Sequence, residues 1–198
     1  MISKIKVYNR FNMEIVAQFG LDSGFPFCDR AWHLVSIHGS SSLYLTDERI
    51  AALKKIGLGS YLSLEFWDIT DSPETIKALK DGGFRYILFT DLQAKQTVKF
   101  LEDRKNEAGD DVLVLHCDAG ISRSGAISEF ACELFGHDRQ EFIKENPYLN
   151  PNPMVLRMLR ESAGMDFKTM YTEQKKIDDE KRKKEMDTFL DQYGHIFV

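Results

Sequence analysis

A cysteine and an arginine separated by five residues form the part of the chain best suited to chemistry. Cys117 ends an apolar run that starts at Val112, and Arg123 stands shortly before a second apolar stretch. A loop of this length can curl so that its backbone N–H groups point inward, above the positive end of a following helix. It could hold a phosphate-sized anion, with the Arg123 guanidinium on two oxygens and the Cys117 sulfur below the phosphorus.

The neighbours of these two residues fit the same chemistry. Inward amides and a helix N-terminus favour the thiolate of Cys117, which is the nucleophilic form. Gly120 supplies a backbone conformation that other residues resist, and Ser124 could donate a hydrogen bond to the sulfur when it leaves. We expect His116 to brace the loop through its carbonyls rather than to react. Asp118 is unfavourable beside an anion, so we expect its side chain to point away from the pocket.

The motif His116-Cys117-x5-Arg123-Ser124 resembles the signature of the cysteine-based protein tyrosine phosphatase superfamily. Its interior is most similar to the small dual-specificity branch of bacterial and phage type. The resemblance implies catalysis through a phosphocysteine intermediate, without metal or cofactor. It also implies a phosphate-binding loop made of Asp118, Ala119, Gly120, Ile121, Ser122 and Arg123. The alternative interpretation is an inert cysteine buried at the end of a core strand.

The reaction also needs a proton for the leaving oxygen, which a thiolate cannot provide. Proteins with this signature place an aspartate on a loop after an upstream strand, and Asp68 and Asp71 are the candidates here. We choose Asp68, because it directly follows an apolar strand whose end would face the ligand crevice. Asp71 could instead stabilise a helix N-terminus. Asp91, beside another helix start, is the third choice.

The order of apolar patterns predicts an α/β fold with a mostly parallel sheet of about four to five strands and helices on both faces. Strands are expected near residues 5–8, 34–37, 61–66 and 112–116, and helices near 9–19, 46–56, 73–80, 90–101, 124–135, from 138 and over 153–162. Residues 84–89 could be a short strand or a packed loop. Residues 1–165 are expected to form a phosphatase domain, and residues 166–198 a charged helical extension.

Composition narrows the class of protein further. The chain has 198 residues, 43% of them hydrophobic, and a formal net charge of −5, so a nucleic-acid partner held by overall charge is disfavoured. The sequence shows no membrane-spanning apolar run and no secretory signal, and its three cysteines lack framework spacing. These features predict a cytoplasmic protein that does not enter a membrane. The histidines show no ligand spacing, so no metal is expected.

Together the motif and its surroundings predict a phosphomonoester hydrolase, a protein-tyrosine or dual-specificity phosphatase with a phosphorylated protein as its partner. An RNA 5′-phosphatase or a phosphoinositide phosphatase is the enzymatic alternative, since these use similar loops. Two lysines within the loop would favour the lipid, and this loop has none. A catalytically inactive phosphate-binding interaction module is the alternative from another class, although such a module would have no need of Cys117.

Overall fold

One parallel sheet organises the fold. The computed structural model describes residues 2–19, 31–39, 45–107 and 110–165, and its strands are β1 (Ile2–Asn9), β2 (Trp32–His38), β3 (Leu58–Glu65) and β4 (Asp111–Cys117). They lie in the order β1-β4-β2-β3, and every pair is parallel. The predicted α/β fold with four to five mostly parallel strands is therefore confirmed.

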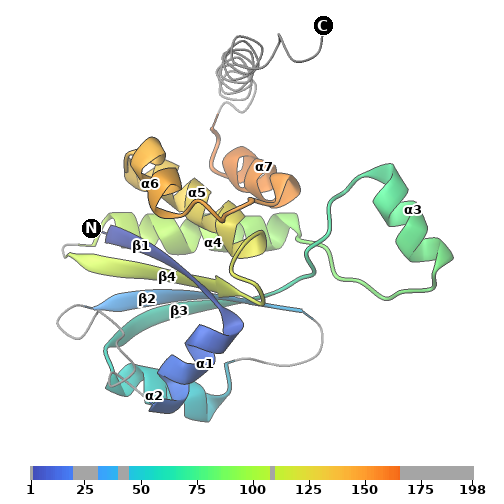
Figure 1. Ribbon diagram of the computed structural model, residues 1–198. Coiled ribbons are helices and arrows are strands. Elements are labelled where there is room, and N and C mark those ends of the chain that lie inside the picture. The colour runs from blue at the N-terminus through green and yellow to red at the C-terminus, as the bar shows by residue number, and fades with distance from the viewer. Residues whose placement is uncertain (1, 20–30, 40–44, 108–109, 166–198) are drawn as a thin grey trace, which may run out of the picture. The chain divides into compact units, whose positions relative to one another are not determined.

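Helices cover both faces of this sheet (Figure 1). In the described residues they are α1 (Arg10–Phe19), α2 (Asp47–Lys55), α3 (Pro73–Asp81), α4 (Asp91–Lys105), α5 (Arg123–Phe135), α6 (Arg139–Glu145) and α7 (Pro153–Ser162). α1 and α2 lie on one face, and α4 to α7 lie on the other. Strands β2 and β4 are almost wholly buried between these layers, as expected for the central strands of a parallel sheet.

The helices begin where short polar side chains can cap them. Thr90 and Gln93 form a capping box at the start of α4, with the Thr90 hydroxyl and the Gln93 side chain each accepting the other residue's backbone N–H. The N-caps of α2, α3, α6 and α7 are Thr46, Ser72, Asp138 and Asn152. Residues 84–89 form a loop rather than a strand, and this loop packs the Phe89 ring 4.8 Å from that of Phe66.

The chain leaves the neighbouring strands β1 and β4 toward opposite faces of the sheet. After β1 it enters α1, whereas after β4 it enters α5 on the other face (Figure 1). At such a switch point the two connections diverge and open a crevice beyond the carboxyl ends of the strands. The backbone N–H of Arg10 donates to the Asp118 carbonyl across this point, at 3.1 Å. The fold therefore places the residues after Cys117 at the position where open α/β sheets bind ligands.

The chain divides into a compact unit of Met1–Ala163 and a second unit of Gly164–Val198. The helical extension expected over residues 166–198 lies outside the described residues, so the boundary at 165 stays a prediction. The described part of the chain contains no helix that is both long and apolar enough to span a bilayer.

Candidate active site

Cys117 ends β4, and its sulfur lies inside the turn that leads into α5. The thiol is buried, with the residue 2% exposed. The Gly120 N–H donates to Sγ at 3.2 Å, and the Ser124 hydroxyl lies 3.1 Å from Sγ. A sulfur contacted by a backbone amide and a hydroxyl at a helix N-terminus is in an environment that stabilises negative charge.

Gly120 allows the loop to close around the sulfur. Its φ is +72°, a conformation that residues with a Cβ rarely adopt, and a Cβ here would lie 2.7 Å from the carbonyl carbon and oxygen of Tyr8. The position thus excludes a side chain both by its backbone angles and by its closeness to the end of β1.

Three backbone hydrogen bonds fix the outer side of the loop. The carbonyls of Asp118, Ile121 and Ser122 accept N–H groups at 3.1, 3.3 and 3.1 Å; the donors are Arg10, Asn150 and Asn152. Ala119 and Ile121 are exposed, and Ser122 is half-buried. These bonds anchor the loop to the surrounding chain, and the N–H groups of the first turn of an α-helix such as α5 have no intrahelical partner and can bind an anion.

Arg123 is the first residue of α5 and is 5% exposed. Its Nη1 donates to the Phe66 carbonyl at 3.0 Å, and its Nη2 donates to the Asp118 carboxylate. Its Nε is buried and has no hydrogen-bond partner among the described residues. The expectation that Asp118 points away from the pocket is wrong. Its carboxylate turns toward Arg123, because the flanking Arg123 and Arg10 guanidinium groups attract it.

The candidate acids occupy different surroundings. Asp68, two residues beyond the Phe66 that packs on Phe89, accepts a hydrogen bond from the loop hydroxyl of Ser122 at 2.8 Å through Oδ1. Asp71 accepts from Arg157 of α7 at 2.6 Å and is more than half exposed. Asp91 begins α4 and is exposed. Asp68 is thus the candidate whose carboxylate contacts the loop.

Asn152 joins this site, although the sequence indicated only a helix start. Its amide Nδ2 donates to Asp68 Oδ1 at 2.9 Å and to the Ile69 carbonyl at 3.3 Å. Its Oδ1 accepts the N–H groups of Met154 and Val155 and so caps α7. The side chain is 3% exposed. The available signal was the Asn150-Pro-Asn-Pro153 stretch, whose rigid backbone can hold an amide in place.

His116 is a neutral residue of the core. Burial lowers the pKa of its imidazole to about 3, and the nearby Asp118 carboxylate only partly opposes this. The ring, 1% exposed, is uncharged near neutral pH. Burial likewise raises the pKa of the Cys132 thiol to about 11, which fits a small core residue rather than a second reactive cysteine.

A second polar cluster lies at the opposite, amino end of the strands. His33 Nε2 is 3.2 Å from Asp111 Oδ2 and 3.8 Å from Glu107 Oε2. These residues come from separate elements, so sequence spacing did not indicate the group. The Arg104 guanidinium already pairs with Glu107 at 3.1 Å, and His33 Nδ1 contacts the Ser60 hydroxyl at 2.8 Å. With these groups engaged, we assign no metal to it.

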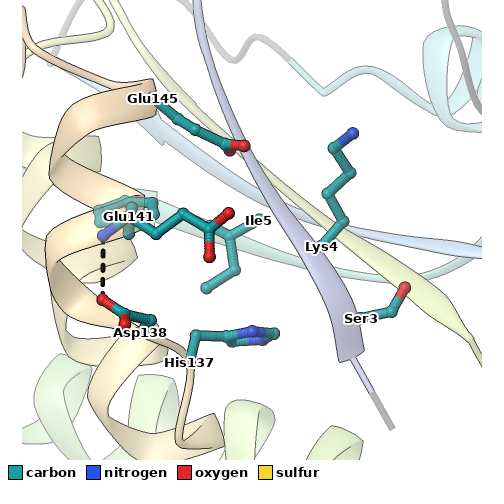
Figure 2. A pocket seen from close by; sticks show the side chains of 8 residues that line it. Ser3, Lys4, Ile5, His137, Asp138, Glu141 and Glu145 are labelled. Carbon is teal, nitrogen blue, oxygen red and sulfur yellow. Dashed lines mark hydrogen bonds between the residues drawn. The ribbon is translucent and has the colours of Figure 1, made fainter.

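A surface pocket of about 290 Å³ lies between β1 and α6, separate from the loop (Figure 2). Ser3, Lys4 and Ile5 line one side, and Asp138, Glu141 and Glu145 line the other. In Figure 2 the carboxylates of Glu141 and Glu145 extend from α6 toward β1. Three carboxylates against one lysine do not favour a phosphate, so the loop after Cys117 is the better anion site.

Comparisons with known proteins match this chain to solved structures at low sequence identity. No known protein family and no curated protein matches the sequence. Solved structures that match include a human tyrosine phosphatase-like serine/threonine/tyrosine-interacting protein, at 16% identity over 85% of this chain and 93% of that chain, with a TM-score of 0.44. PTPMT1 in complex with PI(5)P matches at 18% identity over 81% of this chain and 90% of that chain, with a TM-score of 0.44. DUSP15 matches at 23% identity over 81% of this chain and 83% of that chain, with a TM-score of 0.42. Each of these three matches has less than 25% identity and a TM-score below 0.5, so the function is argued from the site itself.

Proposed function

We propose that the chain is a phosphomonoester hydrolase that acts through a phosphocysteine intermediate. The observation that carries this proposal is the position of the Cys117 sulfur. It lies between the Gly120 N–H and the Ser124 hydroxyl, at the N-terminus of α5 and in the same short loop as the Arg123 guanidinium. A cysteine that only packs in the core would not need an amide, a hydroxyl and a guanidinium placed around its sulfur.

In the first step the Cys117 thiolate attacks phosphorus, an S–P bond forms, and the bond from phosphorus to the ester oxygen breaks. Asp68 gives its proton to that oxygen, which leaves as an alcohol or phenol. The loop amides and the Arg123 guanidinium stabilise the equatorial oxygens of the transferring group. The Ser122 and Asn152 hydrogen bonds to Asp68 support this role, because they hold its carboxylate beside the loop.

In the second step water attacks the phosphocysteine, and the Asp68 carboxylate takes a proton from that water. The S–P bond breaks, and the Ser124 hydroxyl donates to the departing thiolate. The 3.1 Å contact between Ser124 Oγ and Cys117 Sγ supports this assignment. His116 takes no part in proton transfer, since its imidazole is neutral and buried.

The proposed substrate is a phosphorylated protein in the cytoplasm, carrying phosphotyrosine with or without phosphoserine and phosphothreonine. This follows from the resemblance of the loop interior to the dual-specificity branch. A 5′-phosphorylated RNA and a phosphoinositide are the competing substrates, and the absence of lysine from the loop argues against the lipid. Initial rates on a phosphotyrosine peptide, a phosphoserine peptide, a 5′-phosphorylated RNA and a phosphoinositide, measured at equal concentration, rank these classes directly.

The first prediction separates the two candidate acids. Hydrolysis of p-nitrophenyl phosphate and phenyl phosphate is measured in EDTA with reductant for the intact protein and for Cys117→Ser, Asp68→Asn and Asp71→Asn. Cys117→Ser should abolish turnover. Asp68→Asn should lower kcat by about 10²-fold or more, with the larger loss on phenyl phosphate, whose leaving group needs the proton more. Asp71→Asn should stay within about twofold, because its carboxylate pairs with Arg157.

Two outcomes would overturn parts of this assignment. A larger loss in Asp71→Asn than in Asp68→Asn would move the acid to Asp71. An intact protein that binds phosphate or vanadate without turning over either ester would instead be the inactive phosphate-binding interaction module.

A further inference from the structure

The Asp118 carboxylate accepts a hydrogen bond from the Arg123 guanidinium, the same group that would bind a phosphate in the proposed reaction. Asp118 follows Cys117 directly, and its carboxylate pairs with Nη2 of Arg123. Its backbone is fixed at the same time, because its carbonyl accepts the Arg10 N–H at 3.1 Å. The main chain therefore fixes the position of the Asp118 backbone, and charge draws its carboxylate to Arg123.

The other nitrogens of Arg123 show which positions an anion can use. Nη1 is committed to the Phe66 carbonyl at 3.0 Å, and this acceptor belongs to the main chain. Nε is buried without a hydrogen-bond partner in the described part of the chain. A guanidinium binds an oxyanion best through two adjacent N–H groups. Nη1 gives an N–H to the Phe66 carbonyl and Nε gives none, so we assign the anion to the Nε–Nη2 edge, where the Asp118 carboxylate competes for Nη2.

Arg10 is a second cationic partner within reach of the Asp118 carboxylate. Its Nη1 lies 4.0 Å from Asp118 Oδ1, whereas Arg123 Nη2 binds the other oxygen, Oδ2. The Asp118 side chain is half exposed, so solvent leaves room for it to turn. A small rotation toward Arg10 would free Nη2 and keep the carboxylate next to a positive charge.

We propose that Asp118 is an internal competitor for phosphate, which occupies Nη2 of Arg123 in the empty loop and turns toward Arg10 when a phosphate group binds. The inference rests on the proposed function only in that the loop binds phosphate. Asp118 then sets the affinity of the site, because the apparent dissociation constant rises as the fraction of free Nη2 falls. If the pair is closed nine-tenths of the time, phosphate binds about tenfold more weakly than to the open loop.

The test measures the dissociation constant of inorganic phosphate by calorimetric titration of the full chain and its variants. Asp118→Asn should bind phosphate about tenfold more tightly, since the amide neither carries the charge nor pairs with Arg123 as an ion. Asp103→Asn is the matched control. It removes the same charge from an exposed carboxylate on α4 that pairs with Lys99, and it should change the constant by less than twofold.

Arg10→Gln tests the second position of the carboxylate. This change should weaken phosphate binding several-fold in the intact protein, because Asp118 loses its alternative partner and stays on Arg123. In the Asp118→Asn background the same change should have an effect of less than twofold. A general loss of positive charge would weaken binding equally in both backgrounds, so the double-mutant comparison isolates the competitor.

The competitor is refuted if Asp118→Asn binds phosphate no more tightly than Asp103→Asn, or if no variant binds phosphate. Because binding is measured without turnover, the two proposals fail separately. Tighter binding in Asp118→Asn together with no ester hydrolysis by the intact protein overturns the hydrolase and supports the competitor. Hydrolysis that depends on Cys117 without tighter binding overturns the competitor alone.

Discussion

At the scale of single residues, two basic side chains of the site respond differently to burial. His116 and Arg123 are both nearly inaccessible to solvent. The imidazole responds by losing its proton, because burial disfavours its charged form. The N–H groups of the guanidinium are instead accepted by the Asp118 carboxylate and the Phe66 carbonyl. The positive charge beside the loop is therefore that of Arg123, and His116 contributes a neutral, buried ring to the packing.

The neutral state of His116 predicts that the protein loses stability in mild acid. Its pKa is about 3 in the folded chain, whereas an unperturbed histidine has a pKa of 6.5. Between these values the unfolded chain binds a proton that the folded chain does not, so the free energy of unfolding falls as the pH falls. The loss from this residue approaches about 1.4 kcal/mol per pH unit below pH 6.5 and amounts to about 1.6 kcal/mol between pH 6.5 and pH 5.

Urea unfolding at pH 7.5, 6.5 and 5 measures this contribution. His116→Gln has no ionisable group at the position, so its free energy of unfolding should fall less steeply over the same interval. Equal slopes for the intact protein and the variant would show that His116 does not carry the acid sensitivity.

At the scale of elements, the loop is a meeting point of three segments. β4 delivers Cys117, the junction of β1 with α1 holds the Asp118 carbonyl, and the segment before α7 holds Ile121 and Ser122. Such bracing restricts the loop before an anion arrives, which is how a site lowers the cost of ordering its donors on binding. Asn152 joins the proposed acid to the same framework by linking the start of α7 to Asp68.

Because Asn152 both caps α7 and contacts Asp68, we expect substitutions at this position to change stability and activity separately. Asn152→Asp keeps an oxygen that can cap α7, so the free energy of unfolding should change by less than about 1 kcal/mol. It removes the N–H donor to Asp68 and places a second carboxylate beside it, so kcat should fall by about tenfold or more. Asn152→Ala should lose both kcat and about 1 kcal/mol or more of stability, because the cap is also lost.

Urea unfolding and p-nitrophenyl phosphate hydrolysis on the same preparations provide both readings. If Asn152→Asp kept the kcat of the intact protein, Asn152 would be a helix cap alone. A proportional loss of stability and kcat in Asn152→Asp would also contradict the positioning role.

Local patterns explain why most of these elements could be predicted from the sequence. The Thr90-x-x-Gln93 box and the Ser72-Pro73 start are encoded within four residues, and the strand before Cys117 is a short apolar run. The site contacts that were missed join residues far apart in the chain. Asn152 meets Asp68 across 84 positions. The turn of Asp118 toward Arg123 depended on Arg10, which the sequence alone did not place beside the loop.

At the scale of the whole molecule, the proposed phosphate site has to overcome an unfavourable overall charge. A net charge of −5 repels phosphate dianions at long range, so attraction has to be local. The switch point between β1 and β4 supplies it by bringing the N-terminus of α5, Arg123 and Arg10 to one edge of the sheet. The acidic pocket between β1 and α6 is lined by none of these groups.

The last prediction concerns how much of the chain the site requires. Every residue assigned a role in the proposed reaction, from Asp68 to Asn152, lies within the compact unit Met1–Ala163. A polypeptide of residues 1–165 should therefore unfold in one cooperative transition and keep the kcat/KM of the full chain within about twofold. Thermal unfolding followed by circular dichroism and hydrolysis of p-nitrophenyl phosphate measure the two properties.

Residues 1–151 serve as the control, because this piece lacks Asn152 and α7, whose buried side chains include Val155 and Leu159. The shorter piece should neither fold cooperatively nor turn over the ester. If residues 1–165 folded but lost activity, residues 166–198 would contribute to the reaction, and the domain boundary proposed at 165 would be wrong.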